Sequence, residues 1–276
     1  MHWKSLNYRR PKKFNYQLGP AMKRIFTLTA GRTGSAWLSE FLAQNIECTA
    51  IHEPLEIDDF GQSMPDIKTM RSFNHSGNND WVRGFWRRKF ALIESDVYVE
   101  TNHTLGKCGL IENVLINNLE DTTSIIILKR DLVKQCCSYV QRGDFLNITI
   151  PWQWYLHPTY RLVMVNPEPF QRFGAFAQPL WYCYEMEVRQ EYYFRKYSKN
   201  ISMVRANLED IVTVGGARAL LSDLGYECNP FIPPAKNATA AASDMRLTTQ
   251  IRDIMGHITL DFDQILGDLS DKGFSF

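Results

Sequence analysis

The hydrophobic positions of this chain fall into short runs separated by mixed segments. The clearest run lies at residues 124–129 (SIIILK), where consecutive aliphatic residues predict a strand that is covered on both faces of a sheet. Shorter runs predict further strands at residues 24–29, 48–51, 97–101 and 201–205. We therefore expect a sheet with the segment at 124–129 as a central strand.

Helical patterns separate the predicted strands. Two glycines follow the first strand, and the next apolar-periodic segment runs to about residue 43 with one hydrophobic face made of Trp37, Leu38, Phe41 and Leu42. Helices are also predicted at residues 108–119, 132–142 and 214–224. Strands that alternate with helices predict a three-layer α/β fold, with a central parallel sheet and helices on both faces.

Four segments depart from this alternation. Residues 56–90 are polar, which predicts irregular structure, and residues 233–246 are rich in Pro, Ala and Asn, which predicts a loop. Residues 145–197 are crowded with aromatic side chains and predict a cap insertion, whose rings mostly form a small core. Residues 1–22 predict a basic arm. No linker divides the chain, so we expect one domain over residues 1–276.

Charge gives little indication of a macromolecular partner. Lysine and arginine number 31, aspartate and glutamate number 30, and the resulting net charge of +1 predicts no binding to nucleic acid. Basic residues do gather in the arm and at residues 83–89. We interpret both clusters as solvated surface, with attraction to an anionic acceptor or a membrane surface as the alternative.

The six cysteines are scattered and form no C-x-x-C pair, so neither a zinc ribbon nor a redox dithiol is expected. Scattered thiols favour a reducing compartment. The longest early apolar run, at residues 25–30, is too short to cross a membrane. No metal-ligand spacing is present. We expect a cytoplasmic protein with no integral membrane segment and no metal.

The segment TLTAGRTGSAWL, at residues 27–38, carries the strongest chemical signal. A strand, a loop with Gly31 and Gly34, and a helix start follow one another, so backbone N–H groups and the helix N-terminus converge on one point. Arg32 adds a charge, and Thr33 and Ser35 add hydroxyl groups. This pattern predicts an anion cradle. It lacks the Gly-Lys-Ser/Thr ending of a nucleoside triphosphatase loop and the G-x-S-x-G spacing of a hydrolase.

Here the chain resembles the sulfotransferases. Arg32-Thr33-Gly34-Ser35-Ala36-Trp37 is similar to their phosphosulfate-binding loop. Arg130 at a strand end, with Ser138 eight positions further on, is similar to their 3′-phosphate-binding pair, although Leu132 stands where the family has proline. The segment MVRANLEDIV, at residues 203–212, resembles a third family motif with a two-residue difference.

The resemblance implies a P-loop-like fold and the cofactor 3′-phosphoadenosine 5′-phosphosulfate (PAPS). It places the cofactor's 5′-phosphosulfate on residues 32–37 and its 3′-phosphate on Arg130 and Ser138, and it gives Arg32 a catalytic role as well. The implied activity is transfer of a sulfuryl group to an acceptor hydroxyl on a carbohydrate or another small molecule.

Two residues are candidates for the base that deprotonates the acceptor. Glu53 follows the second predicted strand in IHEPL, which resembles carbohydrate sulfotransferases, and His103 follows the third in VETNHTL, which resembles cytosolic ones. Both follow strand ends, where open α/β sheets bind ligands. We favour Glu53 and keep His103 as the alternative. A P-loop small-molecule kinase and a non-catalytic nucleotide- or glycan-binding module are the rival functions.

Overall fold

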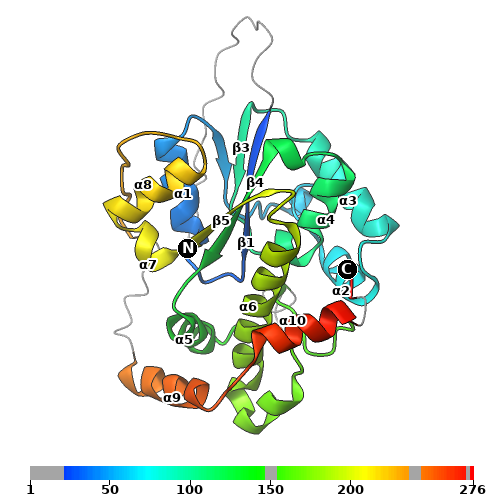
Figure 1. Ribbon diagram of the computed structural model, residues 1–276, viewed down its shortest axis with the longest axis vertical. Helices are drawn as coiled ribbons and strands as arrows, with labels where there is room; N and C mark the ends of the chain where they lie inside the picture. The colour runs from blue at the N-terminus through cyan, green and yellow to red at the C-terminus, as the bar shows by residue number, and fades with distance from the viewer. Residues whose placement is uncertain (1–21, 147–153, 236–243, 272–273) are drawn as a thin grey trace, which may run out of the picture.

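Five parallel strands form a sheet at the centre of the protein, in the order β2-β3-β1-β4-β5 (Figure 1). The computed structural model describes residues 22–146, 154–235, 244–271 and 274–276. The strands are β1 (Lys23–Thr29), β2 (Thr49–Ile51), β3 (Val97–Glu100), β4 (Thr123–Lys129) and β5 (Ser202–Asn207). Strand β1 pairs with both β3 and β4 and therefore lies in the middle of the sheet.

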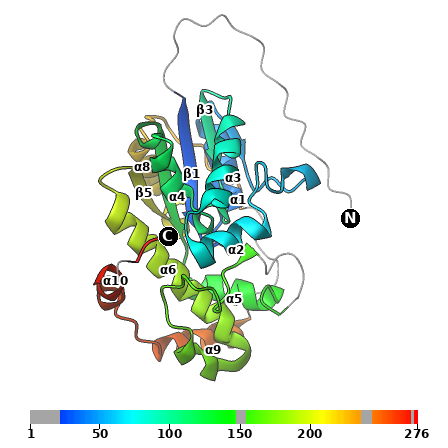
Figure 2. The same ribbon diagram turned by 90° about the vertical axis from the view of Figure 1, so that its right-hand side faces the viewer.

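Helices cover both faces of the sheet (Figures 1 and 2). Helices α1 and α8 pack on one face, and α3, α4 and α6 pack on the other. Helices α5 and α9 lie beyond the carboxyl ends of the strands (Figure 1). In chain order the helices are α1 (Ser35–Asn45), α2 (Ile67–Ser76), α3 (Asp80–Ala91), α4 (Leu110–Ile116), α5 (Leu132–Arg142), α6 (Ala177–Tyr197), α7 (Leu208–Ile211), α8 (Val214–Asp223), α9 (Met245–Gly256) and α10 (Phe262–Asp271).

Strand β4 supplies residues to both hydrophobic cores. Ile125 and Ile127 belong to the core that contains α3, α4 and α6, whereas Ile126 and Leu128 belong to the core that contains α1 and α8. Successive side chains of a strand point to opposite faces. The continuous aliphatic run in the sequence therefore follows from burial on both sides of the sheet.

The structure confirms the predicted α/β fold with a parallel sheet between two helical layers. All five predicted strands are present, and the largest shift is in the last one, which was expected at residues 201–205 and is found at Ser202–Asn207. Helix α4 is shorter than the pattern at 108–119 predicted. It begins after Gly109, whose φ of 85° is left-handed and interrupts the helix.

The expectation of irregular structure at residues 56–90 is wrong, because helices α2 and α3 occupy most of this segment. Helix α3 buries Val82, Phe85, Trp86 and Phe90, which follow a helical spacing. Four basic residues stand among them and mask the apolar face in the sequence. The caps at Asp66 and Asn79 accept hydrogen bonds from the first turns of these two helices.

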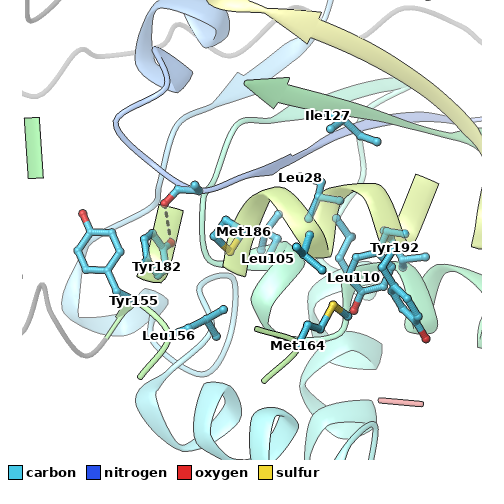
Figure 3. Close-up of a cluster of buried hydrophobic side chains, with 14 of the residues drawn as sticks. Leu28, Leu105, Leu110, Ile127, Tyr155, Leu156, Met164, Tyr182, Met186 and Tyr192 are labelled. Atoms are coloured by element: carbon cyan, nitrogen blue, oxygen red, sulfur yellow. Dashed lines mark hydrogen bonds between the residues drawn. The ribbon is translucent and has the colours of Figure 1, made fainter. Parts of the chain in front are cut away.

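The region expected to be a cap insertion, residues 145–197, is only partly separate from the main fold. Its second half is the 21-residue helix α6, and Tyr182 and Met186 of this helix share a buried cluster with Leu28 and Leu105 (Figure 3). The side-chain amide of Gln190 donates to the carbonyl groups of Leu28 and Leu128, at 2.9 and 3.2 Å. Helix α6 is thus a layer of the main fold.

Two sequence expectations fall largely outside the described residues. Of the basic arm at residues 1–22, only Met22 is described, and residues 236–243 of the expected loop at 233–246 are not described. Helix α9 begins at Met245, within the end of that loop. Among the helices in the described ranges, none is both long enough and apolar enough to cross a membrane.

The contact between Gln190 and the sheet can be tested by substitution. We expect Gln190→Leu to lower the free energy of unfolding by about 1–3 kcal/mol, because two buried hydrogen bonds are lost while the side-chain volume is nearly kept. Urea unfolding followed by circular dichroism measures this change. Gln44→Leu, on the exposed side of α1, is the matched control and should shift stability by less than about 0.5 kcal/mol. Equal stability of the two variants would show that Gln190 does not tie α6 to the sheet.

Candidate active site

A pocket with a volume of about 1080 Å³ lies at the carboxyl ends of the strands. The loops that follow four parallel strands meet at this edge of the sheet, which is where open α/β sheets bind ligands. Arg32 follows β1, Glu53 follows β2, His103 follows β3 and Arg130 follows β4, and all four line the pocket. Ser138, on α5, lines it as well. The structure therefore brings together predicted site residues from five segments.

The loop between β1 and α1 turns its carbonyl groups into the protein. The Tyr182 hydroxyl donates to the Ala30 carbonyl at 2.6 Å (dashed line in Figure 3), and the Tyr139 hydroxyl donates to the Gly31 carbonyl at 2.7 Å. In a planar peptide the C=O and N–H groups point in opposite directions. The N–H groups of Gly31 and Arg32 therefore face away from these tyrosines, toward the pocket that both residues line.

Helix α1 begins at the pocket without a side-chain cap. Gly34 is its N-cap residue, with a left-handed φ of 86°, and the Leu38 N–H is the first to donate within the helix, to the Gly34 carbonyl. The N–H groups of Ser35, Ala36 and Trp37 consequently have no acceptor within the helix. Free N–H groups and the positive end of the helix dipole suit an anionic ligand.

Left-handed backbone conformation also gathers at this pocket. Among the described residues other than glycine, Arg32 (φ 56°), Glu53 (φ 45°) and Asn118 (φ 52°) have positive φ, and the first two line the pocket. This conformation costs an ordinary residue roughly 1 kcal/mol and collects at functional sites.

The side chains of the loop residues do not all reach the pocket. Thr33 is buried and does not line the pocket, and its hydroxyl shares a hydrogen bond with the Thr29 hydroxyl at 2.5 Å. Trp37 lines the pocket while its indole stacks on Phe41 and donates to the Pro233 carbonyl at 3.0 Å. Ser35 and Ala36 line the pocket in the first turn of α1.

Two arginines give the pocket positive charge that no carboxylate neutralises directly. The Arg32 Nε donates to the Ser138 hydroxyl at 2.9 Å, and an Arg130 Nη donates to the Arg32 carbonyl at 3.1 Å. Within the described part of the chain neither guanidinium forms an ion pair. The Nε of Arg130 is buried and has no hydrogen-bond partner there. Burial is the main cause that lowers the pKa of Arg32, and an arginine still keeps its charge.

The third motif segment reaches the same place. Leu208 lines the pocket, and the Glu209 carboxylate accepts from the backbone N–H of Asp131 at 3.2 Å. Glu209 also lies 3.7 Å from the Lys134 amine. The segment after β5 thus braces the turn that carries Arg130.

Glu53 lies between two histidines. Its Oε1 is 3.9 Å from the Nε2 of His103, and its Oε2 is 3.9 Å from the Nε2 of His52. The Nδ1 of His52 is 2.7 Å from the Thr101 carbonyl, which only accepts, so His52 donates from Nδ1. His103 packs closely on the loop after β1, because a Cβ at Gly31 would stand 3.2 Å from its ring. The two candidate bases are therefore neighbours.

A lysine that the sequence analysis missed lies beneath His103. Lys107 is fully buried, and its amine is 2.8 Å from the Nδ1 of His103. Burial is the main cause that lowers the pKa of Lys107 to about 7. Burial, followed by Lys107, also keeps the pKa of His103 well below its ordinary value. In the sequence, only the spacing of four residues between His103 and Lys107 indicates this contact. That spacing between a histidine and a lysine is too common to predict a contact.

Other pocket residues were also missed, because they belong to no motif. Arg142 pairs with Asp144 at 3.1 Å, and the Tyr155 ring stacks on His103 with centroids 5.3 Å apart. In the part of the chain that the structure describes, no group of three or more His, Cys, Asp or Glu side chains is placed to hold a metal ion.

Comparisons with known proteins give matches among solved structures only. No family model matches the chain, and no curated protein matches it. A solved structure described as a sulfotransferase from Alicyclobacillus acidocaldarius matches with a TM-score of 0.43 and 14 % sequence identity. The match covers 87 % of this chain and 98 % of that one.

Gly34 provides a test of the loop geometry. We expect Gly34→Ala to lower the free energy of unfolding by about 2 kcal/mol or more, because the residue has a left-handed φ and an added Cβ would lie 2.6 Å from the Leu208 side chain. Thermal or urea unfolding measures this. Gly215→Ala in α8 is the control, where a Cβ meets nothing and should stabilise by up to about 1 kcal/mol.

The double variant Gly34→Ala/Leu208→Ala separates the two causes. Removing the Leu208 side chain should relieve its close contact with the added Cβ. The free-energy cost of a left-handed φ at an alanine in position 34 should remain. A fully stable Gly34→Ala single variant would contradict the left-handed turn at the start of α1.

Proposed function

We propose that this protein is a sulfotransferase that uses PAPS to transfer a sulfuryl group to an acceptor hydroxyl. One observation carries the proposal. The same pocket holds two arginines without carboxylate partners, an uncapped helix N-terminus and the Glu53–His103 pair. Sulfuryl transfer needs positive groups around a leaving phosphate and a proton acceptor beside the attacking hydroxyl.

The residues that line the pocket suit a nucleotide that carries two separate anionic groups. The N–H groups at residues 31–37 and Arg32 would hold its 5′-phosphosulfate, and Arg130 with Ser138 would hold its 3′-phosphate. The partnerless Nε of Arg130 supports this assignment, because a buried donor without an acceptor costs free energy until a ligand supplies one. When bound, PAPS supplies the sulfuryl group to be transferred. The protein's contribution is to neutralise charge on the phosphates and to fix their position.

Glu53 is our proposed proton acceptor. Its carboxylate lines the pocket and has a side-chain exposure of 20 %, so an acceptor hydroxyl can reach it. The His103 Nε2, 3.9 Å away, is close enough to assist it or to replace it. A base within reach of the attacking oxygen usually contributes about 10²–10⁴ in rate.

The acceptor is a small molecule or a carbohydrate in this proposal. Phe60 and Trp154 line the pocket with their rings edge to face, 5.3 Å between centroids, and Tyr155 lies nearby. Aromatic rings of this kind can stack on a sugar or on an aromatic acceptor. The whole chain, residues 1–276, would act as one domain.

Nucleotide discrimination tests the proposed 3′-phosphate site. We expect adenosine 3′,5′-bisphosphate to bind more tightly than adenosine 5′-monophosphate by about 1.5–3 kcal/mol, because the 3′-phosphate gains charge-assisted hydrogen bonds. Titration calorimetry measures both affinities. Arg130→Ala should abolish the difference, while Arg218→Ala, an exposed arginine on α8 that contacts Asn229, should keep it.

Three results would contradict parts of this proposal. Equal affinity of the wild-type protein for the two nucleotides would remove the 3′-phosphate site. Tighter binding of ATP with Mg²⁺ than of the bisphosphate would instead favour a kinase. Bisphosphate binding without any sulfuryl transfer would leave a non-catalytic nucleotide-binding module.

Substitution of Glu53 tests the proposed base. At a pH of about 6, we expect Glu53→Gln to lower kcat by roughly 10²–10⁴, because the amide keeps the shape of the carboxylate but cannot take the proton. Binding of the bisphosphate should remain nearly unchanged. Transfer of ³⁵S-labelled sulfate from PAPS to a panel of sugars and phenols measures turnover.

Glu47→Gln, an exposed carboxylate outside the pocket, is the matched control and should be fully active. Loss of turnover in His103→Gln together with full activity of Glu53→Gln would make the histidine the base instead of the glutamate.

A further inference from the structure

The amine of Lys107 is buried among three hydrogen-bond partners, and two of these partners, His103 and Trp154, line the pocket. These partners are the Nδ1 of His103 at 2.8 Å, the Trp154 carbonyl at 2.6 Å and the Tyr182 hydroxyl at 2.9 Å. Lys107 itself does not line the pocket, whereas His103 does. Among these three partners, His103 is the titratable group that lines the pocket, so the protonation of Lys107 can act on a ligand through the imidazole.

Two of the three contacts can be made in one direction only. The Trp154 carbonyl is an acceptor, so Lys107 donates to it. The Tyr182 hydroxyl has a single proton, which it donates to the Ala30 carbonyl at 2.6 Å, so it accepts from Lys107. Burial keeps the pKa of Tyr182 well above its ordinary value, so this proton stays in place. Two N–H bonds of the lysine are thus committed.

The third substituent position on the Lys107 nitrogen faces His103. It holds an N–H bond when the lysine is charged and a lone pair when the lysine is neutral. A charged lysine places a third N–H there, so the His103 Nδ1 must accept, and a neutral imidazole then carries its proton on Nε2. A neutral lysine places its lone pair there, so Nδ1 must donate, and Nε2 then carries the lone pair. The two forms present opposite hydrogen-bonding characters to Glu53 and to the pocket.

We propose that Lys107 is a positioning residue whose protonation selects the tautomer of His103 and thereby decides which neighbour accepts the proton of the substrate. With the lysine charged, the Nε2–H of His103 points toward Glu53 and only Glu53 can act as the base. With the lysine neutral, Nε2 becomes a second proton acceptor. This inference rests on the proposed function for the substrate hydroxyl and on the contacts above for the switch.

The protons balance in this scheme. Passing from the first form to the second, one proton moves from the lysine Nζ to Nδ1 and another leaves Nε2, so the pair loses one proton in total. In the reverse direction, Nε2 takes the proton of an acceptor hydroxyl while the electron pair stays on that oxygen. The Nδ1 proton then returns to the lysine, which stores the charge away from the cofactor phosphates.

The surroundings allow this exchange near neutral pH. Burial is the largest cause of the lowering of the Lys107 pKa to about 7, with Arg189 acting in the same direction and Cys108 and Glu53 opposing it. The lysine is thus charged below that pH and neutral above it. The pKa of His103 is held well below its ordinary value by burial, Lys107, His52 and Arg32, so the ring stays neutral throughout. The rings of Tyr155 and Tyr182 also face the amine, with centroids at 5.1 and 5.4 Å.

The tautomer can be observed directly in the full-length protein. We expect long-range ¹H–¹⁵N spectra of the histidine side chains, recorded from a pH of about 6 to about 8.5, to show the two His103 nitrogens exchanging protonated and lone-pair shifts with a midpoint near 7. His103→Gln assigns the signals. One unchanging tautomer over this range, or conversion of His103 to imidazolium with a midpoint inside it, overturns the proposal.

Matched variants separate a switch from a merely structural lysine. Lys107→Met should abolish the pH dependence of the His103 signals. Lys196→Met should preserve it, although the amine of Lys196 also donates to a tyrosine hydroxyl, at 2.5 Å from Tyr192. If Lys107→Met does not fold, the wild-type spectra alone still decide the question.

A turnover measurement connects the switch to the proposed function. Glu53→Gln should regain roughly tenfold in kcat between a pH of about 6 and about 8.5, as the neutral fraction of a lysine with a pKa near 7 rises. The added Lys107→Met change should remove this gain. A tautomer exchange without any sulfuryl transfer would overturn the proposed function and leave the switch standing. Sulfuryl transfer with a single fixed tautomer would overturn only the switch.

Discussion

The hydrogen bonds on the carbonyl groups of Ala30 and Gly31 are the constraint on which the pocket depends. Tyr139 and Tyr182 hold these two carbonyls from inside the protein, and the Gln135 amide also donates to Gly31, at 3.1 Å. All three side chains are buried, and burial keeps both tyrosine pKa values well above the ordinary value, so both hydroxyls remain donors. With these carbonyls turned inward, the N–H groups of the same two peptides, those of Gly31 and Arg32, point away from the tyrosines.

The same constraint joins the two halves of the proposed active site. Tyr182, which holds the loop between β1 and α1, accepts a hydrogen bond from Lys107, and Lys107 contacts His103. His103 in turn packs against Gly31, where an added Cβ would make a tight contact with its ring, at 3.2 Å. Buried polar networks of this kind are costly unless every member is satisfied. A substitution at Lys107 or His103 is therefore expected to disturb the loop between β1 and α1 as well.

Local sequence patterns predicted the sheet and the strand ends well, and they failed where contacts distant in the sequence decide the structure. The aliphatic run of β4 predicts a buried strand, and the glycines after β1 predict a turn. Both predictions succeed because strand conformation and a left-handed φ depend mainly on the local residues. Helix α3 was missed because arginines and a lysine lie between its buried residues. Helix α6 was mistaken for part of a cap, because its aromatic residues show their role only when the sheet packs against them.

The sequence by itself determined the α/β class and the placement of Arg32, Glu53, His103 and Arg130 after strands of one parallel sheet, because parallel strands must end at a common edge. Tertiary structure alone decided that the Thr33 hydroxyl faces inward, that Glu53 lies 3.9 Å from His103 and that Lys107 lies beneath the imidazole. The reason is physical. Periodicity and turn conformation depend on residues that are neighbours in the sequence. The burial, the pKa values and the hydrogen-bond directions of the site residues depend instead on groups brought together from α6, β1 and the loop after β3.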